Sequence, residues 1–149
     1  MSAPIRIVVL NGPNTNLYGL DPNGPYGTLT IDDISERCRA CAANLGATLE
    51  FRQSNHEGVL VDWLQAARTE ADGIIINAGS LSYSSIAILD ALSAAALPAI
   101  QVHVSNVFKR ENFRHYSPLS SVVTGCIIGL GPEGYEMAVA ALIARLKSS

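Results

Sequence analysis

The sequence predicts an α/β fold in which a parallel, doubly wound sheet of five strands is covered by helices on both faces. Short apolar runs alternate along the chain with longer stretches of helical periodicity. Most runs are followed by polar or glycine residues and then by a residue suited to the start of a helix. The run from Ile74 to Ile76 is apolar throughout, as expected for a strand buried on both faces. This alternation is typical of flavodoxin-like sheets with right-handed crossovers.

The first half of the chain predicts two strand-helix units. Their elements are a strand from Ile5 to about Leu10, a helix over 31–45, a strand over 47–53 and a helix over about 56–69. Thr30 is expected to cap the first helix, with Asp33 completing a capping box and Gly46 following its end. Asn55 is expected to cap the second helix. A long loop rich in Gly and Pro separates the first strand from the first helix.

The second half predicts three more strands, and we expect five strand-helix units in strict alternation. The elements are a strand over 73–77, a helix from Ser82 or Ser84 to about Ala96, a strand over 99–105, a strand within 121–129 and a helix from Pro132 to about Leu146. A polar segment over 106–120 lies between the last two strands.

Length and charge restrict the function. The 149 residues fit a single domain over 1–149, and the net charge is −3 without any block of Lys or Arg. Nucleic acid and membrane surfaces are therefore not expected as partners. The chain is 48% hydrophobic and only 15% charged, which favours surface buried in a homo-oligomer. The apolar run near the N-terminus is too short for a signal peptide or a spanning helix, so we expect a cytoplasmic protein.

Polar residues at the carboxyl ends of the strands mark the expected site, because open parallel sheets bind ligands there. These residues are Asn11 to Asn14, Gln53 to Asn55, Asn77 to Gly79, His103 to Ser105 and Gly129 to Gly131. They are uncharged apart from the titratable histidine. Such a set favours a hydroxylated small molecule over a nucleotide.

Motifs for cofactors and metals are weak. The GLGPEG segment from Gly129 has dinucleotide-binding spacing, but it falls on the last unit and Glu133 would repel a pyrophosphate, so we interpret it as a turn. Cys38 and Cys41 lie inside a predicted helix, and we expect both, with Cys126, to be thiols. The three histidines lack metal-ligand spacing. We expect neither a cofactor nor a metal.

His103 and Tyr26 are the candidates for acid-base chemistry. His103 ends a strand, with Gln101 on the same side of that strand, and this position favours a general acid or base. Tyr26 lies in the first loop, where position alone leaves a surface role open. For Asn14 and Asn77, which follow strands, turn formation and ligand binding both remain open.

Five segments together resemble type II 3-dehydroquinate dehydratases. They are LNGPNTNLYG, PYGTLTIDDI, FRQSNHEG, GIIINAGS and QVHVSNVFKRENFRHYS, in the family's order over nearly the whole chain. The resemblance implies a flavodoxin-like fold, a dodecamer built from trimers, and a cofactor-free lyase that converts 3-dehydroquinate to 3-dehydroshikimate. It also implies a place in the shikimate pathway of aromatic amino acid biosynthesis.

The resemblance further implies roles for single residues. Tyr26, as phenolate, would abstract a proton next to the ketone, Asn14 would hold the water that stabilises the enolate, and His103 would protonate the departing hydroxyl. The hydroxyls and the carboxylate of the substrate would be held by Asn77, Ser105, the backbone at Val104, and Arg114. Asp90 would reach the site of a neighbouring subunit, which ties activity to assembly.

Four positions depart from the family's pattern, and one of them is Ala78, where the usual N-P-G has a proline. Asp21 stands where the family has an arginine that favours the phenolate, and a nearby carboxylate opposes it. Gln101 replaces a glutamate, and it can orient the histidine ring without favouring its cationic form. Tyr83 replaces a histidine that contacts substrate. Lys109 and Arg110, far along the chain, are the candidates for a replacement cation.

Two other functions stay open. A lyase acting on a modified cyclic keto-acid, such as an aminated dehydroquinate, would pair a cationic substrate group with Asp21. A non-catalytic binding protein would keep the pocket without the base.

Overall fold

The computed structural model describes residues 3–149. Its five strands are all parallel and lie in the order β2-β1-β3-β4-β5. They are β1 (Ile5–Asn11), β2 (Ala47–Gln53), β3 (Gly73–Asn77), β4 (Ala99–His103) and β5 (Gly125–Ile128). The helices are α1 (Ile31–Asn44), α2 (Glu57–Glu70), α3 (Ile86–Ala95) and α4 (Glu133–Ser148). This is the flavodoxin-like strand order, so the predicted fold class is confirmed.

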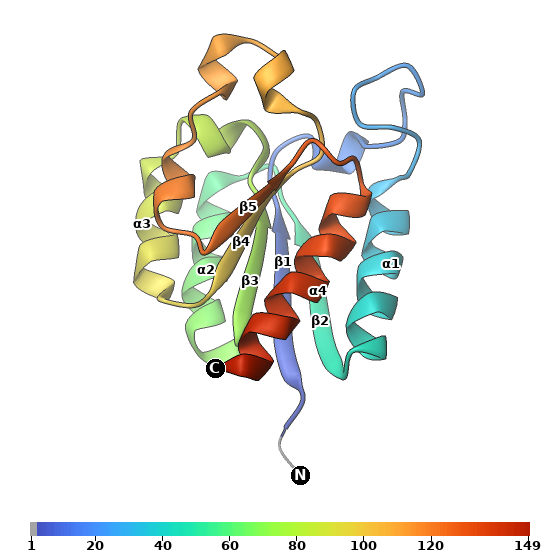
Figure 1. The fold of residues 1–149 in the computed structure, drawn as a ribbon. Coiled ribbons are helices and arrows are strands. Elements are labelled where there is room, and N and C mark those ends of the chain that lie inside the picture. Colours follow the sequence, from blue (N-terminus) through green and yellow to red (C-terminus); the bar gives the residue numbers. More distant parts are fainter. Residues whose placement is uncertain (1–2) are drawn as a thin grey trace.

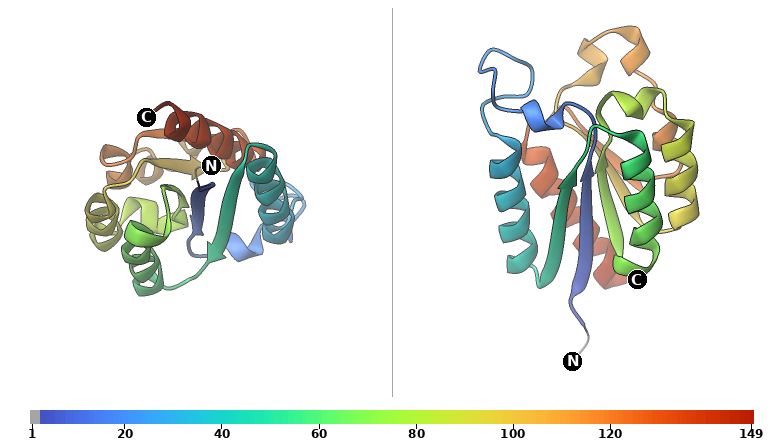
Figure 2. Two further views of the ribbon diagram at one scale, coloured as in Figure 1. Left: turned by 90° about the horizontal axis from the view of Figure 1, so that it is seen from below. Right: turned by 180° about the vertical axis from the view of Figure 1, so that it is seen from behind.

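The sheet lies between two layers of helices (Figures 1 and 2). Helices α1 and α4 cover one face, and α2 and α3 cover the other. Neighbouring residues of β1 enter opposite layers, because successive side chains of a strand point to opposite faces. Val9 packs in the cluster that holds Ile34 of α1, and Leu10 packs in the cluster that holds Leu60 of α2. Burial on both faces explains the apolar runs 7–10 of β1 and 74–76 of β3.

The starts of the first two helices test the predicted caps. Thr30 Oγ1 accepts the Asp33 N–H at 3.1 Å, and the Asp33 carboxylate accepts the Thr30 N–H at 3.0 Å, which confirms the capping box. The predicted cap of α2 is wrong, since His56 takes that position. The Asn55 side chain instead accepts the backbone N–H of Asn14 at 3.0 Å. Asn55 therefore holds the first loop rather than a helix.

The predicted start of α3 is also wrong. A 3-10 helix over Gly79–Tyr83 comes first, and the cap is Ser85, whose Oγ accepts the Ile88 N–H at 2.9 Å. The Ser85 hydroxyl also donates to the Glu57 carboxylate at the start of α2. This contact between two helices favours Ser85 as the cap of α3 over the serines that precede it. The 3-10 helix also brings Tyr83 to the carboxyl end of the sheet.

Strict alternation of strands and helices fails between β4 and β5. Three short 3-10 helices replace the fifth helix within residues 3–149. They are Val107–Lys109, Asn112–Arg114 and Pro118–Ser121. The segment is polar and has no apolar stripe of helical period to bury against the sheet. The first two of these helices stand above the carboxyl ends of the strands, in orange in Figure 1, and Pro118–Ser121 lies lower, beside α3.

The weak motifs of the sequence have structural roles. In GLGPEG, the Gly129 N–H donates to the His103 carbonyl and the Gly131 N–H to the Val104 carbonyl, both at 3.0 Å, so the segment is a turn at the end of β5. All three cysteines are free thiols, as predicted. Over residues 3–149, no helix combines the length and the apolar character that crossing a bilayer requires.

Candidate active site

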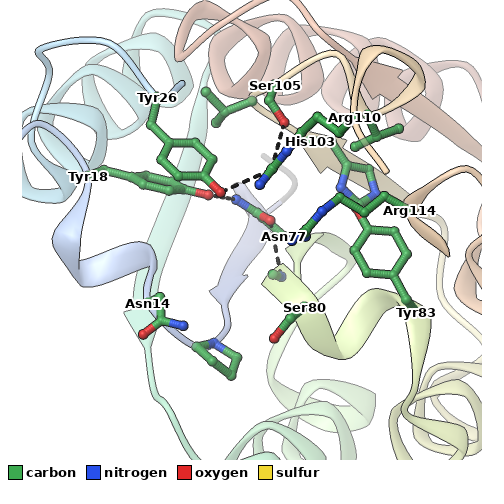
Figure 3. Close-up of a pocket in the computed structure, with 14 residues that line it drawn as sticks. Asn14, Tyr18, Tyr26, Asn77, Ser80, Tyr83, His103, Ser105, Arg110 and Arg114 are labelled. Atoms are coloured by element: carbon green, nitrogen blue, oxygen red, sulfur yellow. Dashed lines mark hydrogen bonds between the residues drawn. The ribbon is translucent and has the colours of Figure 1, made fainter. Parts of the chain in front are cut away.

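A cavity of about 150 Å³ opens at the carboxyl ends of the strands, where the sequence places the site. Three regions line it: the loop after β1, the residues that follow β3, and the end of β4 with the segment beyond it (Figure 3). The predicted residues among the lining are Asn14, Tyr26, Asn77, Tyr83, His103, Val104, Ser105 and Arg114. Tyr18 and Arg110 also line it. Asp90 is exposed on α3 and does not line this cavity.

Arg110 supplies a cation at the hydroxyl of Tyr26. Its Nη1 donates to the Tyr26 oxygen at 3.2 Å and to Ser105 Oγ at 3.3 Å, and its guanidinium carbon lies 5.9 Å from the centre of the Tyr26 ring. Lys109 is exposed and does not line the cavity. Asp21 is exposed too, and its carboxylate accepts the Asn23 N–H at 3.0 Å. The carboxylate is therefore engaged in its own turn, outside the cavity lining.

Gln101 and His103 form a buried pair whose hydrogen-bond polarity can be assigned. The Ser117 hydroxyl donates its single proton to the Ser82 carbonyl at 2.6 Å, so Ser117 Oγ must accept from Gln101 Nε2 at 2.9 Å. Ser120 Oγ donates to Gln101 Oε1 at 2.8 Å, which agrees with this orientation of the amide. Gln101 Nε2 also lies 2.8 Å from His103 Nε2, so that ring nitrogen accepts. His103 therefore carries its proton on Nδ1.

Burial also favours the neutral form of His103. The ring is only 7% exposed, and this desolvation lowers the pKa of His103 from 6.5 to about 4. The Tyr83 ring stacks on it with centroids 5.9 Å apart, and the Arg114 guanidinium lies 5.8 Å from the centre of the Tyr83 ring. Arg114 is held by Glu111, whose carboxylate accepts from Nε at 2.9 Å. His103 is thus a neutral imidazole stacked on Tyr83, and the Arg114 guanidinium contacts the same Tyr83 ring.

The two asparagines differ in their surroundings. Asn77 is 2% exposed, and its Nδ2 donates to the hydroxyls of Tyr18 at 2.8 Å and Tyr135 at 2.7 Å. Asn14 is exposed and has a left-handed backbone with φ of 69°, a conformation that asparagine tolerates better than most residues. Its backbone N–H is held by Asn55. Asn14 therefore presents a side chain to the cavity from a fixed loop.

Tyr18 and Tyr135 were not among the site residues predicted from the sequence. Tyr18 lies in the first loop with Tyr26, and the two ring centroids are 4.6 Å apart. Tyr135 is fully buried in α4. The sequence offered one indication of their role. A buried tyrosine hydroxyl usually needs a hydrogen-bond partner, so each tyrosine pointed to a polar contact inside the fold. The partner, Asn77, is distant in sequence from both.

Comparison with known proteins decides the family. Residues 5–143 match the family model of class II dehydroquinases. The chain belongs to the class II dehydroquinase family. It is 52% identical over 136 residues to the 3-dehydroquinate dehydratase of Azorhizobium caulinodans, covering 91% of this chain and 92% of the relative. It is also 49% identical over 142 residues to the catabolic 3-dehydroquinase of Aspergillus oryzae, covering 95% and 93%.

Solved class II dehydroquinases share the whole fold. The type II dehydroquinase of Butyrivibrio crossotus superposes with a TM-score of 0.91 at 38% identity, over 95% of this chain and 99% of that one. The type II dehydroquinase of Propionibacterium acnes gives a TM-score of 0.89 at 41% identity, over 97% and 98%. The predicted family is therefore confirmed.

Proposed function

We propose that this class II dehydroquinase dehydrates 3-dehydroquinate in the cavity described, with Tyr26 as base, Asn14 as holder of the water at the enolate, and His103 as proton donor to the departing hydroxyl. Family membership over residues 5–143 supports the hydro-lyase activity. The observation that carries the assignment of the base is the hydrogen bond from Arg110 to the Tyr26 oxygen. A guanidinium there stabilises the negative charge of the phenolate.

The positions of Tyr26 and His103 support two proton transfers to and from one bound ring. Tyr26 comes from the loop after β1, and His103 from the end of β4, so a ligand in the cavity lies within reach of both. Tyr26 takes a proton from the carbon next to the ketone. The proton available from His103 is the one on Nδ1, because Gln101 donates to Nε2. The hydroxyl leaves as water with the proton that His103 donates, and the proton taken by Tyr26 then returns through solvent to the imidazole, which restores the phenolate and the neutral His103.

The remaining lining residues fit a cyclic hydroxylated carboxylate. Arg114 is the proposed partner of the carboxylate, since arginine binds carboxylates through parallel N–H groups. Ser105, Asn77, Tyr83 and the backbone at Val104 are the proposed contacts of the rest of the ring.

Assembly and cellular role follow as further parts of the proposal. Trimers joined into a dodecamer would let Asp90, exposed on α3, reach the cavity of a neighbouring subunit. A cytoplasmic place in the shikimate pathway stays a prediction. The alternative with an aminated substrate loses its support, because Asp21 does not line the cavity. No feature of the cavity favours a binding protein without a base.

Steady-state formation of the conjugated enone from 3-dehydroquinate tests the function. Tyr26→Phe should lower kcat by about 10³-fold, because it removes the general base. Arg110→Gln should lower kcat by about 10²-fold, because it removes the donor that stabilises the phenolate.

The matched controls are Tyr116→Phe, which removes a phenol hydroxyl, and Lys109→Gln, which removes a cation, both at exposed residues outside the cavity lining. Both controls should retain wild-type kcat. A wild-type rate no faster than that of Tyr26→Phe would exclude the proposed activity.

A further inference from the structure

A chain of hydrogen bonds with assigned polarity runs through the sheet beneath the cavity. The Gly79 N–H donates to Asn77 Oδ1 at 3.2 Å, so the other end of that amide is Nδ2. Both Nδ2 protons are used, one on the Tyr18 hydroxyl and one on the Tyr135 hydroxyl. Every hydrogen-bonding group of the Asn77 amide therefore has a partner within the protein.

The two tyrosines that accept from Asn77 differ in what happens to their own protons. The Tyr135 hydroxyl donates to Asn11 Oδ1 at 2.7 Å, and Asn11 Nδ2 donates to the Arg52 carbonyl at 3.0 Å. That branch ends in the backbone of β2. For Tyr18, residues 3–149 provide no hydrogen bond that its hydroxyl donates, although the residue is only 6% exposed. Within residues 3–149 the Tyr18 proton is therefore a free donor at the end of this branch.

The free end lies at the cavity. Tyr18 lines it, and Figure 3 shows the Tyr18 and Tyr26 hydroxyls on the same side, near Asn77 and Arg110. The two rings are tilted by 33° with centroids 4.6 Å apart. Burial raises the pKa of the Tyr18 phenol well above its ordinary value, so this hydroxyl keeps its proton where Tyr26 is to act as a base.

We propose that Tyr18 is a substrate-contacting residue whose O–H donates to the ketone oxygen of the bound cyclic keto-acid. The inference rests on the proposed function, in which Tyr26 removes a proton from the carbon next to that ketone. The neighbouring ring of Tyr18 places a donor beside the same end of the substrate. The ketone oxygen gains negative charge as the enolate forms, and the O–H stabilises it without transferring its proton. Asn77 is then a positioning residue that orients Tyr18.

The test compares ligands that differ only at the oxygen in question. Calorimetry would measure the affinity of wild type and Tyr18→Phe for the enone product and for the same ring carboxylate with a methylene in place of the carbonyl. The phenylalanine keeps the ring contact with Tyr26 and removes the donor. Tyr18→Phe should lose about tenfold in affinity for the enone and change little for the methylene analogue. In turnover, kcat should fall by about tenfold or more with a smaller change in KM.

Tyr116→Phe, which removes an exposed hydroxyl, should leave both affinities unchanged. Tyr18→Leu serves as a second variant if circular dichroism shows that Tyr18→Phe does not fold, and it should abolish the same preference for the enone. An equal loss for both ligands, or no loss for either, would overturn the inference.

The outcomes separate this inference from the proposed function. A wild type that prefers the enone through Tyr18 yet does not convert 3-dehydroquinate contradicts the function and supports the contact. If wild type converts 3-dehydroquinate and Tyr18→Phe keeps the same preference for the enone over the methylene analogue, only the proposed hydrogen bond from Tyr18 is contradicted. Failure of wild type to bind either ligand contradicts both.

Discussion

At the scale of single residues, an amide in place of a carboxylate at position 101 decides which nitrogen of His103 carries the proton. A glutamate would accept from Nε2–H and stabilise the imidazolium. Gln101 donates to Nε2, and its orientation is fixed by Ser117 and Ser120. The chain thus holds its proposed acid in the neutral Nδ1–H form.

Gln101→Glu should reverse this polarity. The carboxylate would accept from Nε2–H, so the pKa of His103 should rise from about 4 to its ordinary 6.5 or above. NMR titration of the imidazole nitrogens measures both the pKa and the tautomer, and the acid limb of kcat/KM should move with them. The other titratable groups at this site are Tyr18, Tyr26, Tyr83, Arg110 and Arg114 on the cavity, and Cys126 at Gln101.

Gln65→Glu adds the same charge at an exposed position of α2 and should leave the His103 titration unchanged. An unaltered pKa in Gln101→Glu would show that burial alone sets the pKa of His103.

At the scale of elements, the sequence predicts the strands and helix caps that depend on residues close together along the chain. The strands follow from apolar runs, and the start of α1 follows from Thr30 and Asp33. The cap of α3 depends on a contact between Ser85 and Glu57, and the hydrogen bond between Arg110 and Tyr26 spans 84 positions. Such contacts are set by the packing of distant segments. The family resemblance could therefore identify Tyr26 and His103, whereas the choice of Arg110 over Lys109 as the cation at Tyr26, and the position of Tyr18 at the cavity, required the structure.

The turn after β3 meets the first loop at Gly79. This glycine has φ of +61°, and a Cβ there would lie 2.8 Å from the Pro13 carbonyl oxygen. Gly79→Ala should therefore cost about 3 kcal/mol of unfolding free energy, from left-handed strain and the clash with backbone together. It should also lower kcat, because the clash displaces the loop that carries Asn14. Urea unfolding and steady-state kinetics measure the two effects.

Gly46→Ala is the matched control, since its φ is +78° but its Cβ would meet nothing within 4 Å. It should cost only the strain of about 1 kcal/mol and leave kcat unchanged. Equal effects of the two substitutions on stability and on kcat would contradict a role for this contact in holding the loop.

At the scale of the whole molecule, the strand order places the proposed acid deep in the fold. β4 lies between β3 and β5, so His103 reaches the cavity from the interior of the sheet. Because this burial keeps His103 neutral in the folded state, the stability of the fold depends on the protonation of this residue. The unfolded chain binds a proton on this histidine below pH 6.5, whereas the folded chain does so only below about pH 4. Between these values the unfolded state holds more protons, so stability falls as the pH falls.

This linkage predicts the acid sensitivity of the fold. A pKa of about 4 in place of 6.5 corresponds to at most about 3 kcal/mol, present at pH 7 and lost progressively down to pH 4. Urea midpoints measured from pH 7 to pH 4 at one protein concentration should therefore fall more steeply for wild type than for His103→Gln. His56→Gln, at an exposed histidine, should keep the wild-type slope. Parallel slopes for wild type and His103→Gln would mean that other groups control the loss of stability in acid.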